Sequence, residues 1–177
     1  MRCSSRSSRG QQAVAEELRT DRLVLRRGRM DDAAAMHAIM SNPVAMRYWS
    51  SLPHASFDET EHWMASMVDA DPADSDDFIV TLDGKLIGKL GAWKLPEVGF
   101  LIDPAHWGNG YALEAMVAFI QRRRLLGSSG LTADVDPRNV ASLKLLERVG
   151  FAETHRAKGT WQIGDELCDS VYLKLTL

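Results

Sequence analysis

The chain has 177 residues, of which 45% are hydrophobic and 25% charged, as is ordinary for one soluble globular domain. A formal net charge of −3 argues against nucleic acid as the main partner but leaves room for a local anion site. No apolar run approaches the roughly 20 residues of a membrane span, so we expect no membrane association.

The N-terminal segment differs in composition from the rest of the chain. Its first ten residues are rich in serine and arginine and contain no acidic residue. We expect residues 1–17 to form a flexible tail and residues 18–177 to form the domain. The tail has three interpretations: a loose extension or over-long start, a transit-like segment, or a nucleic-acid arm. The two cysteines, Cys3 and Cys168, form no CxxC pair or disulfide framework, which indicates a reducing cytoplasm.

In the N-terminal half of the domain the sequence pattern predicts a strand, two helices and a three-strand meander. Asp31 or Asp32 is placed to cap the first helix, and Ser56 and Glu59 have the form of a capping box for the second. The segment 71–77 is expected to be an acidic loop. The expected elements are a strand at 22–26, a helix ending at Asn42-Pro43, a helix running to about Asp69, and strands at 78–82, 85–93 and 97–103, with a tight turn at Asp83-Gly84.

The C-terminal half predicts two helices and three strands. The first helix follows a turn with two glycines and ends in basic residues at 121–124. Asp136 or Asn139 caps the second helix, and Gly150 ends it. The helical period places on one face of the first helix Leu113, Met116, Val117 and Ile120. The expected strands lie at 131–135, near 151–158 and near 167–175, the last two joined by a turn at Gly164-Asp165.

This order of elements predicts an α+β or mixed α/β fold. About seven strands would form a largely antiparallel sheet with one crossover, and about four helices would flank it.

The turn before the first of these C-terminal helices has the composition of an anion site. Glycines at Gly108 and Gly110 let main-chain N–H groups converge on one point. The helix N-terminus adds free donors and partial positive charge, a combination that most often binds phosphate or pyrophosphate. The alternative is a strand-to-helix junction that needs glycine only to turn.

Three segments resemble motifs of the GCN5-related N-acetyltransferase (GNAT) superfamily, and in particular its RimJ/RimL-like branch, which acetylates ribosomal-protein N-termini. Thr20–Arg26 is similar to the opening strand of that branch. Trp107–Ala112 fits the pyrophosphate loop Q/R-x-x-G-x-G/A with tryptophan in the first position. Asp136–Ser142, with Glu147–Phe151, is similar to the second cofactor motif. The resemblance implies a splayed central sheet and an acetyl-CoA-dependent N-acetyltransferase.

The resemblance also implies where acetyl-CoA binds as acyl donor, with no metal required. Main-chain amides of Gly108 to Ala112 would hold the pyrophosphate. The pantetheine arm would pair with main-chain groups of Leu101 and Ile102, and Asn139 would reach it from the second helix. The residues expected to bind the cofactor are Leu101, Ile102, Trp107, Gly108, Asn109, Gly110, Tyr111, Ala112, Asn139 and Ser142.

Two residues are candidates for catalysis. Glu97 lies where some superfamily members carry a catalytic glutamate, and partial burial would raise its pKa toward a useful range; the alternative is a solvated strand-end carboxylate. Ser142 would donate to the thiolate or carbonyl, or it simply satisfies the first turn of its helix. Leu146 stands where many members place a tyrosine acid, and Trp161 stands near the glutamate base of RimL.

The acceptor is expected to be a primary amine, on a protein or peptide N-terminus or on a small molecule, and the protein a monomer or homodimer. A catalytically silent CoA-binding module is the alternative function. The acidic segments 58–61 and 69–77 either steer a cationic acceptor or are solvated. Four tryptophans line an acceptor pocket or belong to the core: Trp49, Trp63, Trp93 and Trp161.

Overall fold

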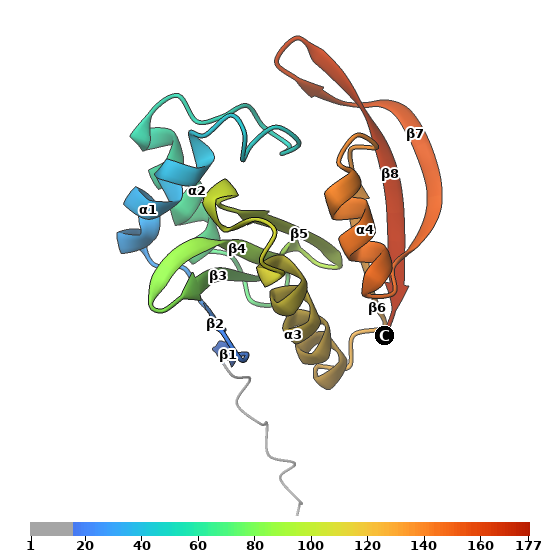
Figure 1. Cartoon of the computed structure of the whole chain (residues 1–177), viewed down its shortest axis with the longest axis horizontal. Helices are drawn as coiled ribbons and strands as arrows, with labels where there is room; N and C mark the ends of the chain where they lie inside the picture. Colours follow the sequence, from blue (N-terminus) through green and yellow to red (C-terminus); the bar gives the residue numbers. More distant parts are fainter. Residues whose placement is uncertain (1–15) are drawn as a thin grey trace, which may run out of the picture.

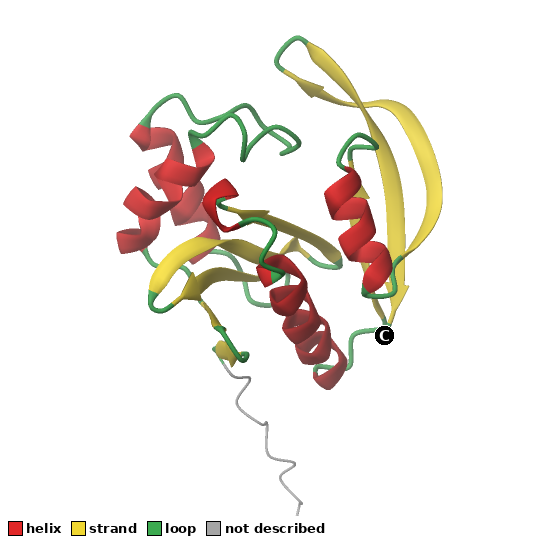
Figure 2. Ribbon diagram, in the orientation of Figure 1, coloured by secondary structure: helices red, strands yellow, loops and turns green. Residues whose placement is uncertain are grey.

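The computed structural model describes residues 16–177, which form an eight-stranded sheet with four α-helices (Figures 1 and 2). The strands are β1 (Glu17–Arg19), β2 (Leu23–Arg26), β3 (Asp76–Leu82), β4 (Lys85–Lys94), β5 (Glu97–Ile102), β6 (Gly130–Val135), β7 (Ala152–Ile163) and β8 (Glu166–Thr176). The helices are α1 (Ala33–Met40), α2 (Phe57–Val68), α3 (Tyr111–Leu125) and α4 (Val140–Arg148), with 3₁₀ turns at Met30–Asp32 and Pro104–His106.

The predicted mixed α/β architecture and its order of elements are confirmed. The sheet has one strand more than expected, because β1 pairs with β2 from Glu17 onward. Glu17 is the last residue of the expected tail, and residues 1–15 of that tail lie outside the described residues. No helix in the described part of the chain has both the length and the apolar character needed to cross a membrane.

The sheet is splayed between β5 and β6. The strand order is β1-β2-β3-β4-β5-β6-β8-β7, and each neighbouring pair is antiparallel except β5 and β6. Those two strands run parallel and share one register pair, Glu97 with Thr132, supported by the Thr132 N–H donating to the Pro96 carbonyl at 3.0 Å. Beyond this point they diverge (Figure 1), so the facing edge of β5 has no partner strand.

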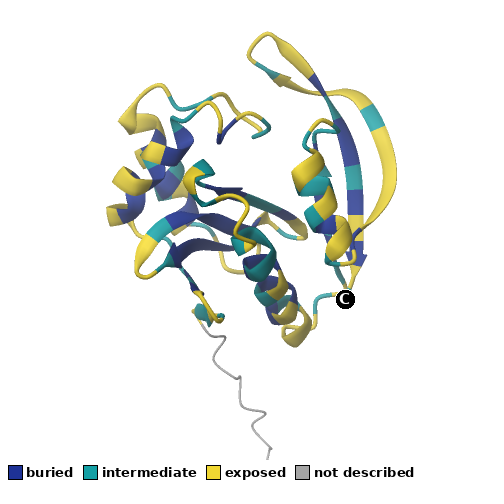
Figure 3. Ribbon diagram, viewed as in Figure 1, coloured by how far each residue is buried: buried dark blue, intermediate teal, exposed yellow. Residues whose placement is uncertain are grey.

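Helices cover both faces of the sheet, and adjacent residues of β3 show which helices cover which. Phe78 belongs to the core cluster with Phe119 of α3, their ring centroids 6.3 Å apart. Ile79 packs instead with Met36 of α1 and Met64 of α2. Because successive strand residues point to opposite faces, α1 and α2 lie on one face and α3 on the other, with the buried residues sandwiched between (Figure 3).

The predicted inward face of α3 is wrong in part. Val117 is 42% exposed, whereas Ala115 and Phe119 are buried together with Met116 and Ile120. The buried stripe is rotated because α3 packs against β1, β2 and β4, and its Phe119 meets Phe78. The apolar period alone did not fix this rotation.

The acidic segment is also shorter than predicted, because its last two carboxylates belong to β3 and are buried. Asp76 accepts from Arg122 at 3.0 Å and from Arg123 and Arg27 at 2.9 Å. Burial alone would raise the pKa of Asp76, but the arginines hold it below its ordinary value. Neither this aspartate nor its neighbour is therefore part of a solvated or steering loop.

The predicted caps have mixed outcomes. Asp32 occupies the N-cap position of α1, but its carboxylate binds Arg26 at 2.6 Å instead of the helix amides. Ser56 caps α2 by accepting from the Glu59 N–H at 3.3 Å. Of the two candidates for α4, Asn139 is the cap, since its side-chain oxygen accepts from the Ser142 N–H at 3.2 Å.

Candidate active site

The turn between β5 and α3 has the backbone geometry that an anion site requires. Gly108 and Gly110 have φ values of 77° and 80°, in the left-handed region that favours glycine. Gly110 is the N-cap of the 15-residue helix α3, so the free amides of its first turn start here. A Cβ built on Gly108 would meet nothing within 4 Å, which leaves open space beside the turn.

Side chains within the turn hold it against the end of β5. The Trp107 indole Nε1 donates to the Ile102 carbonyl at 2.7 Å. The Asn109 side-chain amide donates to the carbonyls of His106 and Trp107 at 3.2 and 3.0 Å. These contacts brace the turn from inside, so its amides are positioned before any ligand arrives.

Strand β2 and its approach brace the turn from outside. The Arg22 guanidinium donates to the Asn109 carbonyl at 3.0 Å and to the Glu114 carboxylate at 2.7 Å. That carboxylate also accepts from the Arg22 N–H at 3.0 Å and from the Thr20 hydroxyl at 2.5 Å. Burial opposes ionisation of Glu114, yet these donors lower its pKa. Sequence reasoning missed this cluster, because nothing local pairs residues 92 positions apart.

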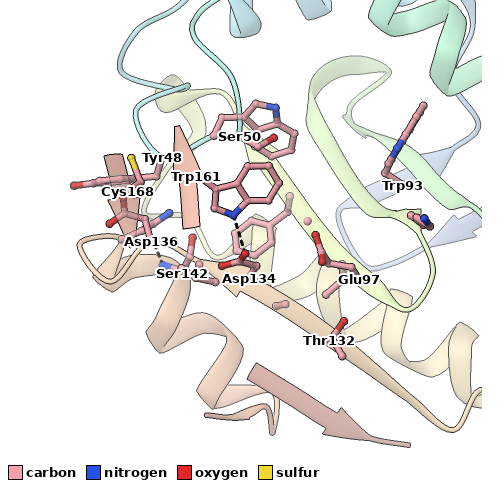
Figure 4. Close-up of a pocket in the computed structure, with 18 of the residues that line it drawn as sticks. Tyr48, Ser50, Trp93, Glu97, Thr132, Asp134, Asp136, Ser142, Trp161 and Cys168 are labelled. Atoms are coloured by element: carbon pink, nitrogen blue, oxygen red, sulfur yellow. Dashed lines mark hydrogen bonds between the residues drawn. The ribbon is translucent and has the colours of Figure 1, made fainter. Parts of the chain in front are cut away.

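Two cavities open where the sheet is splayed. The first, which we call the glycine-turn cavity, has about 650 Å³ and is lined by Gly108, Gly110, Leu101, Ile102 and the start of α4. The second, which we call the tryptophan cavity, has about 750 Å³ and lies above β5 and β6 (Figure 4). The two share six lining residues: Arg47, Tyr48, Trp49, Phe100, Asn139 and Ser142.

The predicted site residues divide between these cavities. Tyr111 and Ala112 line the glycine-turn cavity with Trp107 and the other predicted turn residues, except Asn109, whose side chain braces the turn instead. Asn139 and Ser142 lie at the junction of the two cavities. Glu97 lines the tryptophan cavity but not the glycine-turn cavity. Tyr48 also lies at the junction, and no motif in the sequence pointed to it.

All four predicted tryptophans line the tryptophan cavity. Trp93 and Trp161 are 49% and 43% exposed, so neither is a core residue. The Trp161 indole Nε1 donates to Asp134 of β6 at 2.8 Å, a contact that brings the β7–β8 hairpin over the cavity (Figure 4). Trp49 and Trp63 are partly buried and pack against the core cluster that contains Met36 and Met64, so the core interpretation holds for these two.

Glu97 is the first residue of β5, at the point where β5 and β6 touch. Burial raises the pKa of its carboxyl group, and the nearby Asp134 carboxylate raises it further. A carboxylate with a raised pKa is a stronger base than a solvated one. The Glu97 side chain is nonetheless exposed, as expected for a carboxylate at the end of a strand, so both interpretations of this residue stand.

Helix α4 presents the Ser142 hydroxyl to the cavities, but it has no tyrosine one turn later, where many superfamily members carry an acid. Ser142 lies in the first turn, and Leu146, one turn later, is buried and lines the tryptophan cavity. The polar side chains at the junction are consequently those of Ser142, Asn139, Tyr48 and Arg47.

Comparison with known proteins identifies a family that this chain matches. Residues 22–152 match the acetyltransferase (GNAT) domain family. The uncharacterized N-acetyltransferase YoaA of Bacillus subtilis (strain 168) is 33% identical over 148 residues, covering 76% of this chain and 81% of that protein.

Two solved structures share the fold. RimL, a ribosomal L7/L12 α-N-protein acetyltransferase in complex with coenzyme A, gives a TM-score of 0.82 at 16% identity, covering 92% of this chain and 98% of that chain. Spermidine N-acetyltransferase from Vibrio cholerae, in complex with CoA and spermine, gives 0.76 at 24% identity, covering 89% and 96%. The expected splayed fold is thereby confirmed.

Proposed function

The chain belongs to the GNAT acetyltransferase family and is an N-acetyltransferase; from this premise we propose that it transfers the acetyl group of acetyl-CoA directly to a primary amine in a ternary complex. The acceptor is an N-terminus of a protein or peptide, or a small-molecule amine. One observation carries the proposal: the cavity beside the glycine turn and the acid-lined cavity meet at Asn139 and Ser142. A donor and an acceptor entering from the two sides would meet there.

The glycine-turn cavity fits the acyl donor. The turn amides and the start of α3 suit a pyrophosphate, and the open space beside Gly108 leaves room for it. Leu101 and Ile102 line the same cavity on the unpartnered edge of β5, where an extended pantetheine arm can pair as a strand does. The coenzyme bound in the RimL and spermidine N-acetyltransferase structures supports this assignment by analogy of fold.

The chain's own side chains supply the remaining requirements of acetyl transfer. The amine must lose a proton to attack, and Glu97 is the group in the tryptophan cavity placed to accept it. As the nitrogen–carbon bond forms and the carbon–sulfur bond breaks, negative charge develops on the carbonyl oxygen and then on the sulfur. The Ser142 hydroxyl, at the junction, is the donor we assign to that charge.

Glu97→Gln should lower kcat/KM about 100-fold at neutral pH, the usual size of a general-base contribution. Only the ionised carboxylate accepts a proton, so wild-type activity should fall as pH drops through the raised pKa of Glu97. The deficit of the variant should shrink at high pH, where more of the amine is already neutral. Initial rates of thiol release from about pH 4 to 10 measure both effects.

The matched control is Glu153→Gln, which neutralises an exposed carboxylate on β7 outside both cavities. It should leave the profile unchanged. Equal rates for Glu97→Gln and wild type across the whole range would remove Glu97 from the reaction and leave a water chain as the base.

Glu114→Gln should raise the dissociation constant for CoA about three- to tenfold, with little change in kcat. The substitution removes the charge that holds Arg22 against the Asn109 carbonyl, and hydrogen bonds to charged groups contribute roughly 1.5–3 kcal/mol. Calorimetric titration with CoA gives the affinity. The control Glu61→Gln alters an exposed glutamate on α2. A dissociation constant equal to that of the control would show that the turn holds its shape without this cluster.

A further inference from the structure

We propose that the acceptor is an amine that carries a second positive charge, and that Asp134 binds this charge beside the indole of Trp161. The inference rests on the proposed function, because it names the substrate class of the same site. It is drawn from the charges, the register and the aromatic walls of the tryptophan cavity.

The cavity has an excess of carboxylates over basic side chains. Three basic residues line it, and six acids do: Asp77, Glu97, Asp134, Asp136, Glu166 and Asp169. Three of the acids form ion pairs with two cations, since Asp77 binds Lys89 at 2.7 Å and Asp136 and Glu166 share Arg138. Among residues 16–177, no ion pair is formed by the remaining three, Glu97, Asp134 and Asp169.

Asp134 is the member of this set that lies closest to the proposed base along the sheet. Thr132 is in register with Glu97, and Asp134 is two residues further along β6. Residues two apart on a strand share a face and are separated by about 6–7 Å. The two carboxylates therefore face the same space, as Figure 4 shows, and the Asp134 carboxylate contributes to the raised pKa of Glu97.

Trp161 fixes one oxygen of Asp134 and leaves the other available. Its indole N–H donates to Oδ2 at 2.8 Å. Its ring, with those of Trp49 and Trp93, forms part of the cavity wall, and aromatic faces attract cations. A carboxylate beside aromatic rings favours an ammonium or guanidinium group over a neutral one.

The two carboxylates then have separate roles. Glu97 accepts the proton of the amine that is acetylated, and Asp134 binds the charge that remains on the acceptor. A cation at Asp134 also offsets the repulsion between the two carboxylates. An acceptor with only one amino group would leave Asp134 uncompensated in a partly desolvated cavity, which is unfavourable.

Steady-state kinetics with 1,4-diaminobutane and n-butylamine test the proposal, because the two amines share a carbon chain and differ in the second charge. Wild type should favour the diamine in kcat/KM by at least about tenfold, the size of one charge-assisted contact. Asp134→Asn keeps the acceptor for the Trp161 N–H and removes the charge. It should lose that preference through KM for the diamine. Any effect of the lost charge on the Glu97 base acts on both amines alike, so the ratio of their kcat/KM values reports the contact with the second charge.

Asp165→Asn is the matched control, since Asp165 is exposed in the β7–β8 turn and lines neither cavity. It makes the same change in net charge and should keep the preference. Calorimetric titration of diamine into the CoA-bound protein should show binding in wild type and Asp165→Asn, and about tenfold weaker binding in Asp134→Asn.

Equal use of the two amines by wild type, or an unchanged preference in Asp134→Asn, would overturn the inference and leave the proposed function standing. Faster acetylation of peptides that carry no positive charge besides the α-amino group than of the diamine would also overturn the inference and leave the proposed function standing. Failure to acetylate any amine would instead overturn the proposed function, and this inference with it.

Discussion

Gly110→Val is expected to abolish the stabilisation of the protein by acetyl-CoA. Gly110 has φ 80° and caps α3. A β-branched side chain strains this conformation, and its Cβ would lie 3.7 Å from the Arg22 guanidinium that braces the turn. In wild type, ligand at about 100 times its dissociation constant should add about 2.7 kcal/mol to the free energy of unfolding. In the variant the same ligand concentration should leave the melting temperature unchanged.

The control for backbone strain is Gly127→Val, at the other end of the same helix. Gly127 has φ 74° and open space around it, and it lines neither cavity. Both variants should melt below wild type, but the control should keep the full shift with acetyl-CoA. An undiminished shift in Gly110→Val would place the cofactor outside the glycine-turn cavity.

Asp76→Ala should have the largest effect on stability, about 3–5 kcal/mol, because it removes the buried carboxylate that three arginines share. Arg122 is 7% exposed, and Asp76 is the acceptor for its guanidinium and for those of Arg123 and Arg27. Urea unfolding at neutral pH measures the loss. The control is Asp74→Ala, in the exposed loop just before β3, which should change stability by less than about 0.5 kcal/mol.

The sign of the pH dependence follows from the lowered pKa of Asp76. Its ionised form contributes stability at neutral pH, and this contribution is lost as pH falls below the ordinary aspartate value toward the lower value of the folded state. The stability difference between wild type and Asp76→Ala should therefore narrow in acid. Equal unfolding free energies at neutral pH would mean that the arginines find solvent or other partners.

Local patterns predicted the parts of this protein that depend on neighbouring residues. The predicted tight turn at Asp83-Gly84 and the predicted cap at Ser56 are confirmed. Both could be predicted because each depends on residue types within four positions. The glycine turn was found in the same way, since the left-handed conformations of Gly108 and Gly110 need glycine. The order of elements followed from such signals.

Features that depend on residues far apart in the chain were missed. Arg122 and Arg123 look in the sequence like a solvated basic helix end, but they pair with an aspartate 46 and 47 positions earlier. The same applies to Arg22 with Glu114 and to Asp134 with Trp161. A single sequence does not show which distant residues pair. The clusters that brace the glycine turn and place carboxylates in the tryptophan cavity were therefore found only in the structure.

The central claim is that acetyl-CoA and an amine meet at the junction of the two cavities and that the acetyl group passes between them. The most direct measurement incubates the protein with acetyl-CoA and 1,4-diaminobutane and quantifies free CoA and acetylated amine in the same samples by mass spectrometry. We expect equal amounts of the two products, formed at a rate that depends on Glu97. Binding of acetyl-CoA without acetylation of this or any other amine would contradict the claim and indicate a CoA-binding module.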